Sequence, residues 1–207
     1  LGNAHSVRRV AHLRPFVLPG GSAAIRDPQR IALALARASD LDLPPHIAGR
    51  PDLGHLDALL ANEVNCPTTT SAGRLFDGIA ALLGVVTRST YEGEPAIALE
   101  MAAASTHTRG YPLDTRTTDA GTIELDWRPM VQALVSDQRR GTPTPEIAGR
   151  FHQALVAGML AVVDLVGAAE VGLAGGCFQN RRLEAGAVTA LERSGVSVLT
   201  HRIVPAN

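Results

Sequence analysis

Apolar residues recur at helical spacing along most of this 207-residue chain. Between Thr68 and Leu83, for example, Leu75, Phe76 and Ile79 fall on one side of a helix at about 100° per residue. The same spacing predicts helices at 23–39, 52–63, 94–105, 126–136, 144–166 and 178–193. Apolar positions cover most of the circumference of 144–166, so we expect this helix to be central and buried.

Short apolar runs between these helices predict strands. They lie at 7–18, before the turn Pro19-Gly20-Gly21, and at 123–125, 170–174 and 197–200. The last two flank the helix at 178–193, which is the order of a βαβ unit. The polar segment 107–122 is expected to be a surface loop. The pattern therefore predicts an α/β fold in which helices dominate and strands are few.

Several residues are expected to mark helix ends. Asp52 and Asp126 precede apolar periodic segments and are predicted N-caps. Thr144 is a predicted N-cap with Pro145 at the first helical position. The helix at 68–83 is expected to begin directly after Pro67.

Composition excludes some classes of function. The formal net charge is −1, and all the basic residues are arginines, so no basic nucleic-acid surface is indicated. No apolar run reaches about 18 residues, so no membrane span is expected. The two cysteines, Cys66 and Cys177, are far apart in sequence, which indicates a reducing, cytoplasmic setting. Both ends of the sequence look cut, so we expect a piece of a longer protein.

The stretch LAGGCFQNRRLE, at 173–184, ends a predicted strand on Gly175 and Gly176 and begins a helix at once. A glycine pair there lets the backbone approach a ligand closely, and the helix start offers unpaired N–H groups to an anion. The alternative is a tight strand-to-helix turn without a ligand. The stretch is neither a GxGxxG motif nor a Walker A loop.

A second stretch, CPTTTSAGRLFDGIAALLG at 66–84, places Gly73 and Asp77 four residues apart, away from the apolar stripe. Glycine inside a helix costs about 1 kcal/mol relative to alanine. Beside an acid it suits a flat group that lies on the backbone while the carboxylate accepts hydroxyl hydrogens, as a ribose would require. The alternative is that Asp77 is a solvated surface acid.

Together these stretches carry a resemblance. With YEGEPAIALEMAA, HLRPFVLPGGSAAIRDPQRIALALA and the final HRIVPAN, they resemble the C-terminal carbamoyltransferase domain of the HypF-type hydrogenase maturation proteins. The resemblance covers nearly the whole chain. It implies that residues 1–207 form part of this domain, mostly its nucleotide-binding lobe. It implies a helix-rich lobe of an actin/Hsp70-like (ASKHA) two-lobed fold, and places the family's acylphosphatase, zinc-finger and adenylate-forming domains outside this sequence.

The resemblance also implies a reaction. Family members use carbamoyl phosphate and ATP to make carbamoyl-adenylate and pass the carbamoyl group to the C-terminal cysteine of a HypE-type partner. This supplies the cyanide ligands of [NiFe]-hydrogenase. Matched position by position, Gly73 and Asp77 correspond to the ribose-binding pair, and Gly175, Gly176 and Asn180 to the nucleotide-binding turn, with the Asn180 amide reaching the ribose or base.

The family's metal ligands, a His-x-x-x-His pair and a later Asp, are not matched within this chain, since no two of its seven histidines are four apart. The resemblance places them outside the chain, so an iron or zinc ion belongs to the parent protein. No catalytic residue is assigned here. We expect the piece alone to bind nucleotide weakly at best and to be inactive.

Other residues receive structural interpretations. His152 is expected to be a hydrogen-bonded core histidine, Cys177 to pack against its turn, and Trp127 to anchor packing. Asp114, Arg116 and Asp119 are expected to be solvated. Arg74 is left open between a phosphate ligand and a surface salt bridge.

Two other functions stay open at this point. In the first, the chain is a nucleotide-binding or partner-docking module that catalyses no reaction. In the second, it is a relative of the antibiotic O-carbamoyltransferases and the tRNA threonylcarbamoyladenosine transferases.

Overall fold

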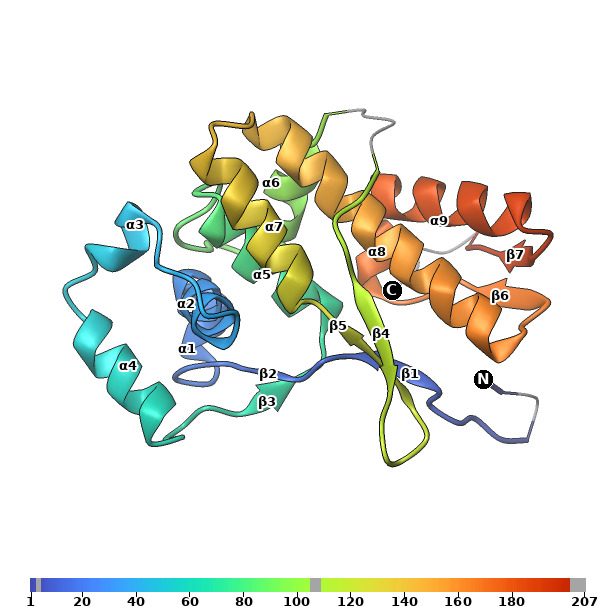
Figure 1. The fold of residues 1–207 in the computed structure, drawn as a ribbon, viewed down its shortest axis with the longest axis horizontal. Coiled ribbons are helices and arrows are strands. Elements are labelled where there is room, and N and C mark those ends of the chain that lie inside the picture. The colour runs from blue at the N-terminus through green and yellow to red at the C-terminus, as the bar shows by residue number, and fades with distance from the viewer. Residues whose placement is uncertain (3–4, 105–108, 202–207) are drawn as a thin grey trace.

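The computed structural model describes residues 1–2, 5–104 and 109–201. Helices make up most of it (Figure 1). Their bounds are α1 Ala23–Arg26, α2 Gln29–Ala38, α3 Pro45–Ala48, α4 Leu53–Ala61, α5 Ala72–Leu82, α6 Glu94–Ala102, α7 Arg128–Arg139, α8 Thr144–Val166 and α9 Arg181–Arg193, with a 3₁₀ turn, η1, at Gly176–Gln179. The prediction of a helix-rich α/β fold is confirmed.

Three small sheets accompany the helices. In the first, β5 (Ile123–Asp126) pairs in parallel with β1 (Ala11–Leu13) and antiparallel with β4 (Asp114–Thr117). In the second, β2 (Phe16–Val17) pairs antiparallel with β3 (Thr68–Thr69). In the third, β6 (Glu170–Gly172) and β7 (Ser197–Leu199) are parallel, with α9 as their crossover. The predicted βαβ unit is therefore confirmed.

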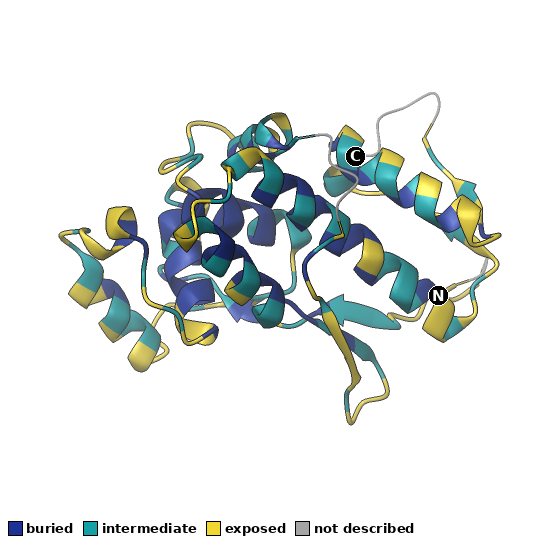
Figure 2. Ribbon diagram, turned by 45° about the horizontal axis from the view of Figure 1, so that its top comes forward, coloured by how far each residue is buried: buried dark blue, intermediate teal, exposed yellow. Residues whose placement is uncertain are grey.

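The main core is helical. Helices α2 and α5 pack closely because Gly78 has no side chain: a Cβ there would lie 2.5 Å from Cδ1 of Leu35. Phe76 on α5 meets Phe151 on α8 edge to face, with ring centroids 4.9 Å apart. The buried residues in Figure 2 follow these helices and α7.

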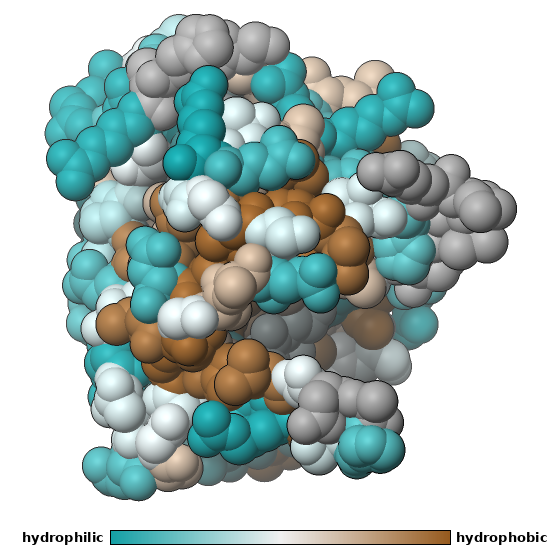
Figure 3. Space-filling view, turned by 90° about the vertical axis from the view of Figure 1, so that its right-hand side faces the viewer, coloured by the Kyte–Doolittle hydropathy of each residue, from teal (hydrophilic) through white to brown (hydrophobic). Residues whose placement is uncertain are grey.

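A second, smaller core lies under the C-terminal unit, residues 170–199, which comprises β6, η1, α9 and β7. It consists of Val163, Leu173, Ala187, Leu191 and Val196. Helix α8 contributes to both cores, and its Met159 packs against each. Apolar side chains also gather on the outside of this part of the molecule (Figure 3), where Leu165 and Leu199 are 62% and 55% exposed.

The prediction for α8 is correct in its bounds and only partly correct in its burial. Its N-terminal half is mostly buried, whereas its last turns, apart from the buried Val163, are half-buried or exposed. Thr144 is its first residue, not its cap, and Pro143 precedes it. By length and composition alone α8 could cross a membrane, but a core helix meets the same criteria, and α8 packs in the core here.

Several local predictions are wrong. The helix expected at 23–39 is interrupted at Asp27 and Pro28, because proline lacks the N–H that a continuous helix needs. The helix expected at 68–83 begins at Ala72, because Thr68 and Thr69 pair with β2. Asp52 precedes α4 but its side chain makes no cap hydrogen bond; it pairs with Arg50 instead.

The loop expected at 107–122 contains β4, and its first two residues lie outside the described part of the chain. All four residues of β4 are exposed, so the strand shows no alternation of apolar and polar positions. The strand β4 is recognised only by its antiparallel pairing with β5, which the sequence pattern does not indicate.

Candidate functional site

Helix α5 carries the first half of the candidate site. Ser71 caps the helix: its Oγ accepts a hydrogen bond from the backbone N–H of Arg74 at 3.3 Å. The cap sets Gly73 in the first turn and Asp77 one turn later. A Cβ at Gly73 would meet only Ser71 Oγ at 3.6 Å and Cys177 Sγ at 3.9 Å, so the protein's own packing does not require glycine here.

Asp77 is buried, which excludes the alternative of a solvated surface acid. Its side chain is 3% exposed, and Oδ2 lies 2.9 Å from Nη1 of Arg74, whose side chain is 16% exposed. Its other oxygen, Oδ1, is buried and has no hydrogen-bond partner among the described residues. A buried acceptor without a donor is unfavourable by about 1–3 kcal/mol, so this atom is suited to a donor from outside the chain.

The charge state of Asp77 follows from this setting. Burial raises the pKa of its carboxyl to about 6, while the charge of Arg74 acts in the opposite direction and that of Glu92 adds to the rise. Arg74 is thus neither exposed nor free: it forms an ion pair next to the buried acid.

The glycine turn carries the second half. Gly175 has φ +94°, a conformation that side chains disfavour, so glycine is needed at this point. The chain then enters η1, and Cys177 of this turn lies against Gly73 of α5. Burial raises the pKa of the Cys177 thiol, and the nearby backbone of Gly73 offsets only part of this. The structure confirms that α5 and the turn lie together and that Cys177 packs against its surroundings.

Asn180 is used within the protein. Its Oδ1 caps α9 by accepting from the backbone N–H of Leu183 at 2.9 Å. Its Nδ2 lies 3.0 Å from Nε2 of His152, whose Nδ1 lies 2.7 Å from the carbonyl of Ala148. Burial lowers the pKa of His152, so Nδ1–H donates and Nε2 accepts in a neutral ring. His152 is the core histidine that was predicted. The two bonds use one N–H of the Asn180 amide and one lone pair of its oxygen, so the predicted contact with a nucleotide would have to use the remaining N–H or lone pair.

The other structural interpretations are confirmed in part. Trp127 is fully buried and donates from Nε1 to the carbonyl of Arg14 at 2.8 Å. Asp114 and Asp119 are exposed as expected. Arg116 is exposed too, and its guanidinium also donates to Glu124 at 2.9 Å across the β4–β5 pair. Asp126 accepts from the backbone N–H of Arg128 at the start of α7, although Trp127 is the capping residue.

The described residues do not fit a metal ion. Within the described ranges, no three His, Cys, Asp or Glu side chains come together as ligands would. The site as described therefore offers one buried carboxylate, an arginine, a glycine-lined helix and a glycine turn. This set can bind hydroxyl and anionic groups.

Comparison with known proteins identifies the family. The model of the "Carbamoyltransferase, Kae1-like Domain, second subdomain" family matches residues 1–207. The chain belongs to this family. Carbamoyltransferase HypF of Synechocystis is 35% identical over 97% of this chain, and that of Rhizobium leguminosarum 34% over 98%. The chain spans 28% and 27% of the length of these relatives.

Solved structures support the same assignment. A crystal structure of full-length HypF in the phosphate- and nucleotide-bound form matches with a TM-score of 0.88, at 27% identity, over 98% of this chain and 27% of that one. The T. kodakarensis HypF structure matches with a TM-score of 0.76 at 23% identity, over 93% of this chain and 27% of that one. At this identity the match supports the fold alone. The chain thus corresponds in sequence and fold to one Kae1-like subdomain of the HypF proteins, and its α/β fold is ASKHA-like.

Two features of this family member were missed by sequence reasoning. Ser71 is the cap of α5, and the Ser-Ala-Gly stretch after Thr70 would have indicated it. Arg50 donates hydrogen bonds to both Asp27 and Asp52, which lie in two separate segments of the chain. No periodic signal in the sequence joins those positions.

Proposed function

We propose that this subdomain binds an adenine nucleotide between α5 and the Gly175–Gly176 turn, as part of an ATP-dependent carbamoyltransferase. The proposal rests on the buried Oδ1 of Asp77, which has no hydrogen-bond partner within the described part of the chain and lies on a helix that contacts the turn. A ribose hydroxyl would supply the missing donor. The phosphate- and nucleotide-bound state of the full-length relative agrees with such a ligand.

The parent protein, in this proposal, acts in the cytoplasm. It uses carbamoyl phosphate and ATP to form carbamoyl-adenylate and transfers the carbamoyl group to the C-terminal cysteine of a HypE-type partner, in the synthesis of cyanide ligands for [NiFe]-hydrogenase. The names of the relatives support the carbamoyl transfer itself. A divalent iron or zinc ion would be held in the parent protein by residues other than the described ones, among which no ligand cluster is found.

The residues of this chain bind and orient. Asp77 accepts hydroxyl hydrogens, and Gly73 leaves a flat stretch of helix against which a sugar can lie. Arg74 pairs with Oδ2 of this carboxylate, which leaves Oδ1 as the acceptor for a ribose hydroxyl. The backbone of the glycine turn can approach the rest of the nucleotide closely.

For the chain by itself, a non-catalytic nucleotide-binding module is the second candidate. Adenylate chemistry develops negative charge that a metal or several cationic groups must stabilise. The described residues hold one arginine at the site and no metal-ligand cluster. Binding without transition-state stabilisation gives affinity but no turnover.

The test uses the intact parent and the Asp77→Ala variant. We expect nucleotide affinity, measured by titration calorimetry, to fall at least about tenfold, which corresponds to about 1.4 kcal/mol. Transfer of labelled carbamoyl to the partner should fall in parallel. Asp119→Ala, which removes an exposed acid from the β4–β5 hairpin, is the matched control and should leave both unchanged.

One result would contradict the proposed nucleotide site, and another would contradict the non-catalytic module. An Asp77→Ala parent with unchanged affinity removes Asp77 from the site. Metal-dependent turnover by the 207-residue chain alone, with ATP, carbamoyl phosphate and the partner, would show that its site is complete.

A further inference from the structure

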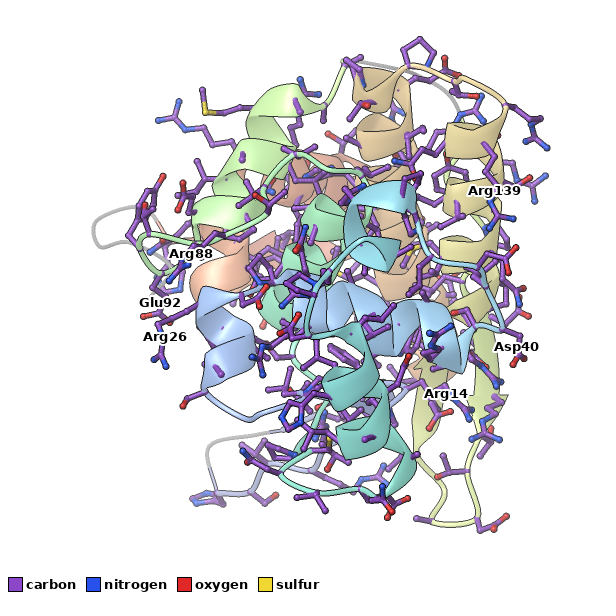
Figure 4. The ribbon with its side chains drawn as sticks, turned by 90° about the vertical axis from the view of Figure 1, so that its left-hand side faces the viewer. Arg14, Arg26, Asp40, Arg88, Glu92 and Arg139 are labelled. Atoms are coloured by element: carbon purple, nitrogen blue, oxygen red, sulfur yellow. The ribbon has the colours of Figure 1, made fainter. Side chains whose placement is uncertain are left out.

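A separate pocket of about 690 Å³ lies where α1, the start of α2, the segment before α4 and the segment after α5 meet. Its charged lining consists of Arg26, Asp27, Arg30, Arg50, Asp52 and Arg88. Neither Asp77 nor the glycine turn contributes to its walls. Figure 4 shows Arg26 and Arg88 near each other on one edge of the molecule, with Arg139 on the opposite edge.

The floor of the pocket is a fixed network around Arg50. Its guanidinium donates to Asp27 at 3.0 and 2.8 Å and to Asp52 at 2.9 Å through two nitrogens. It also donates to Gln29 at 2.7 Å. Burial alone would lower the pKa of Arg50, but the bonds to Asp52 and Asp27 outweigh this and raise it. Paired guanidinium–carboxylate bonds of this kind hold both partners in one geometry.

The network also cancels the negative charge of the pocket. Arg30 bonds Asp27 at 3.2 Å and lies 3.8 Å from Asp52, so Arg30 and Arg50 together neutralise the two carboxylates. Arg26 and Arg88 form no ion pair within the described ranges. Glu92 is near them in Figure 4, but it does not line the pocket. The lining therefore carries a surplus of two positive charges.

This surplus and the size of the pocket define a ligand class. A phosphomonoester carries a charge of about −1.5 to −2 at neutral pH and has oxygen acceptors that match guanidinium donors. A volume of about 690 Å³ is typical of a small-molecule site and exceeds the need of a bare phosphate. Thr87 adds a hydroxyl to the lining, and α2 begins in its wall, which favours an anion further.

We propose that this pocket binds the phosphoryl group of a small phosphomonoester between Arg26 and Arg88. The Arg50 network holds the walls in place, and Arg26 and Arg88 supply the charge. The site is distinct from the one at Asp77, so it stands independently of the function proposed above.

The test titrates phenyl phosphate into the intact protein by calorimetry. We expect the double variant Arg26→Ala/Arg88→Ala to lose one binding site per chain, or to bind there at least about tenfold more weakly. Both side chains are exposed and free of ion pairs within the described ranges, so the fold should be unaffected, as near-ultraviolet circular dichroism would verify. Arg139→Ala removes an arginine from the opposite edge and should change nothing. Arg26→Lys/Arg88→Lys should retain most of the affinity.

Other arms separate this site from its alternatives. Asp77→Ala should keep the phenyl phosphate site, whether or not it loses nucleotide. Equal binding by the protein and the double alanine variant would overturn the proposal, as would equal losses in the double variant and in Arg139→Ala. Tighter binding of inorganic phosphate than of phenyl phosphate, or competition by an acidic decapeptide at lower concentration, would overturn the assignment of a phosphomonoester.

Discussion

Two buried aspartates in this molecule have opposite surroundings. Among the residues that the structure describes, Asp77 on α5 has one ion pair and one oxygen without a partner. Asp137 on α7 accepts from Tyr111 at 2.7 Å and from Arg150 at 2.8 Å through one oxygen, and from Arg140 through the other. Both residues are under 5% exposed, at 2% and 4%. Burial is therefore not what distinguishes them.

The difference shows in their protonation. Burial would raise the pKa of Asp137, but the bonds from Tyr111 and Arg140 and the charge of Arg150 together lower it. Around Asp77 burial prevails, and its pKa rises to about 6. A buried acid with every oxygen satisfied stabilises the fold, whereas one left incomplete is available to a ligand.

The largest expected effect is on the complete network. Asp137→Ala removes the acceptor shared by Tyr111, Arg140 and Arg150 and leaves the buried Tyr111 hydroxyl without a partner. We expect a loss of about 3 kcal/mol in the free energy of unfolding, measured with urea at pH 7. Asp114→Ala, at an exposed position on β4, should change it by less than about 0.5 kcal/mol. Equal losses in the two variants would mean that the network adds no stability.

The second effect concerns pH. Because the pKa of Asp77 is raised to about 6 in the folded state, this acid binds its proton more tightly there than in the unfolded chain. Its contribution to stability is thus greatest below about pH 4 and is lost as the pH rises through about 6, a change of roughly 2–3 kcal/mol. Asp77→Asn should remove this part of the pH profile. A profile that is unchanged between pH 4 and 6 would contradict the raised pKa.

The smallest effect concerns Arg74, whose charge opposes the rise in the pKa of Asp77. In Arg74→Ala the pKa of Asp77 should move further upward, which carbon-13 titration of the carboxyl would follow. Since the acid can then take up a proton, the loss of stability at pH 7 should be only about 1 kcal/mol. A fall in the pKa of Asp77 in this variant would show that Arg74 does not stabilise the carboxylate.

The sequence predicted the helices and strands better than the tertiary contacts of individual side chains. The C-terminal βαβ unit and the bounds of α8 follow from apolar periodicity, which is a local property. Gly73 and Asp77 stood out because a glycine and an acid interrupt a helical pattern. Their proximity to the glycine turn was predicted from a shared ligand; the contact of Cys177 with Gly73 confirms that the start of α5 lies against the turn, and the shared ligand stays a prediction.

What the sequence missed depends on contacts between distant segments. Asp77 lies away from the main apolar stripe, so its burial required knowledge of what packs on that side of α5. The Asp137 network joins Tyr111 and Arg150 from two separate segments, and the strand β4 exists through its pairing with β5. Sequence reasoning did not foresee that the Asn180 amide caps α9 and contacts His152; its contact with a nucleotide stays a prediction. Such partners are set by tertiary packing and have no fixed spacing in the sequence.

Helix α8 runs from the main core into the smaller one, and this has a consequence for local unfolding. We expect the last turns of α8, whose Val163 belongs to the smaller core, to open more readily than its first half, which Ile147, Phe151 and Leu155 hold in the main core. Amide hydrogens within this one helix would then exchange with solvent in two groups. The early amides would report opening of the whole molecule, and the late ones only the release of the small core.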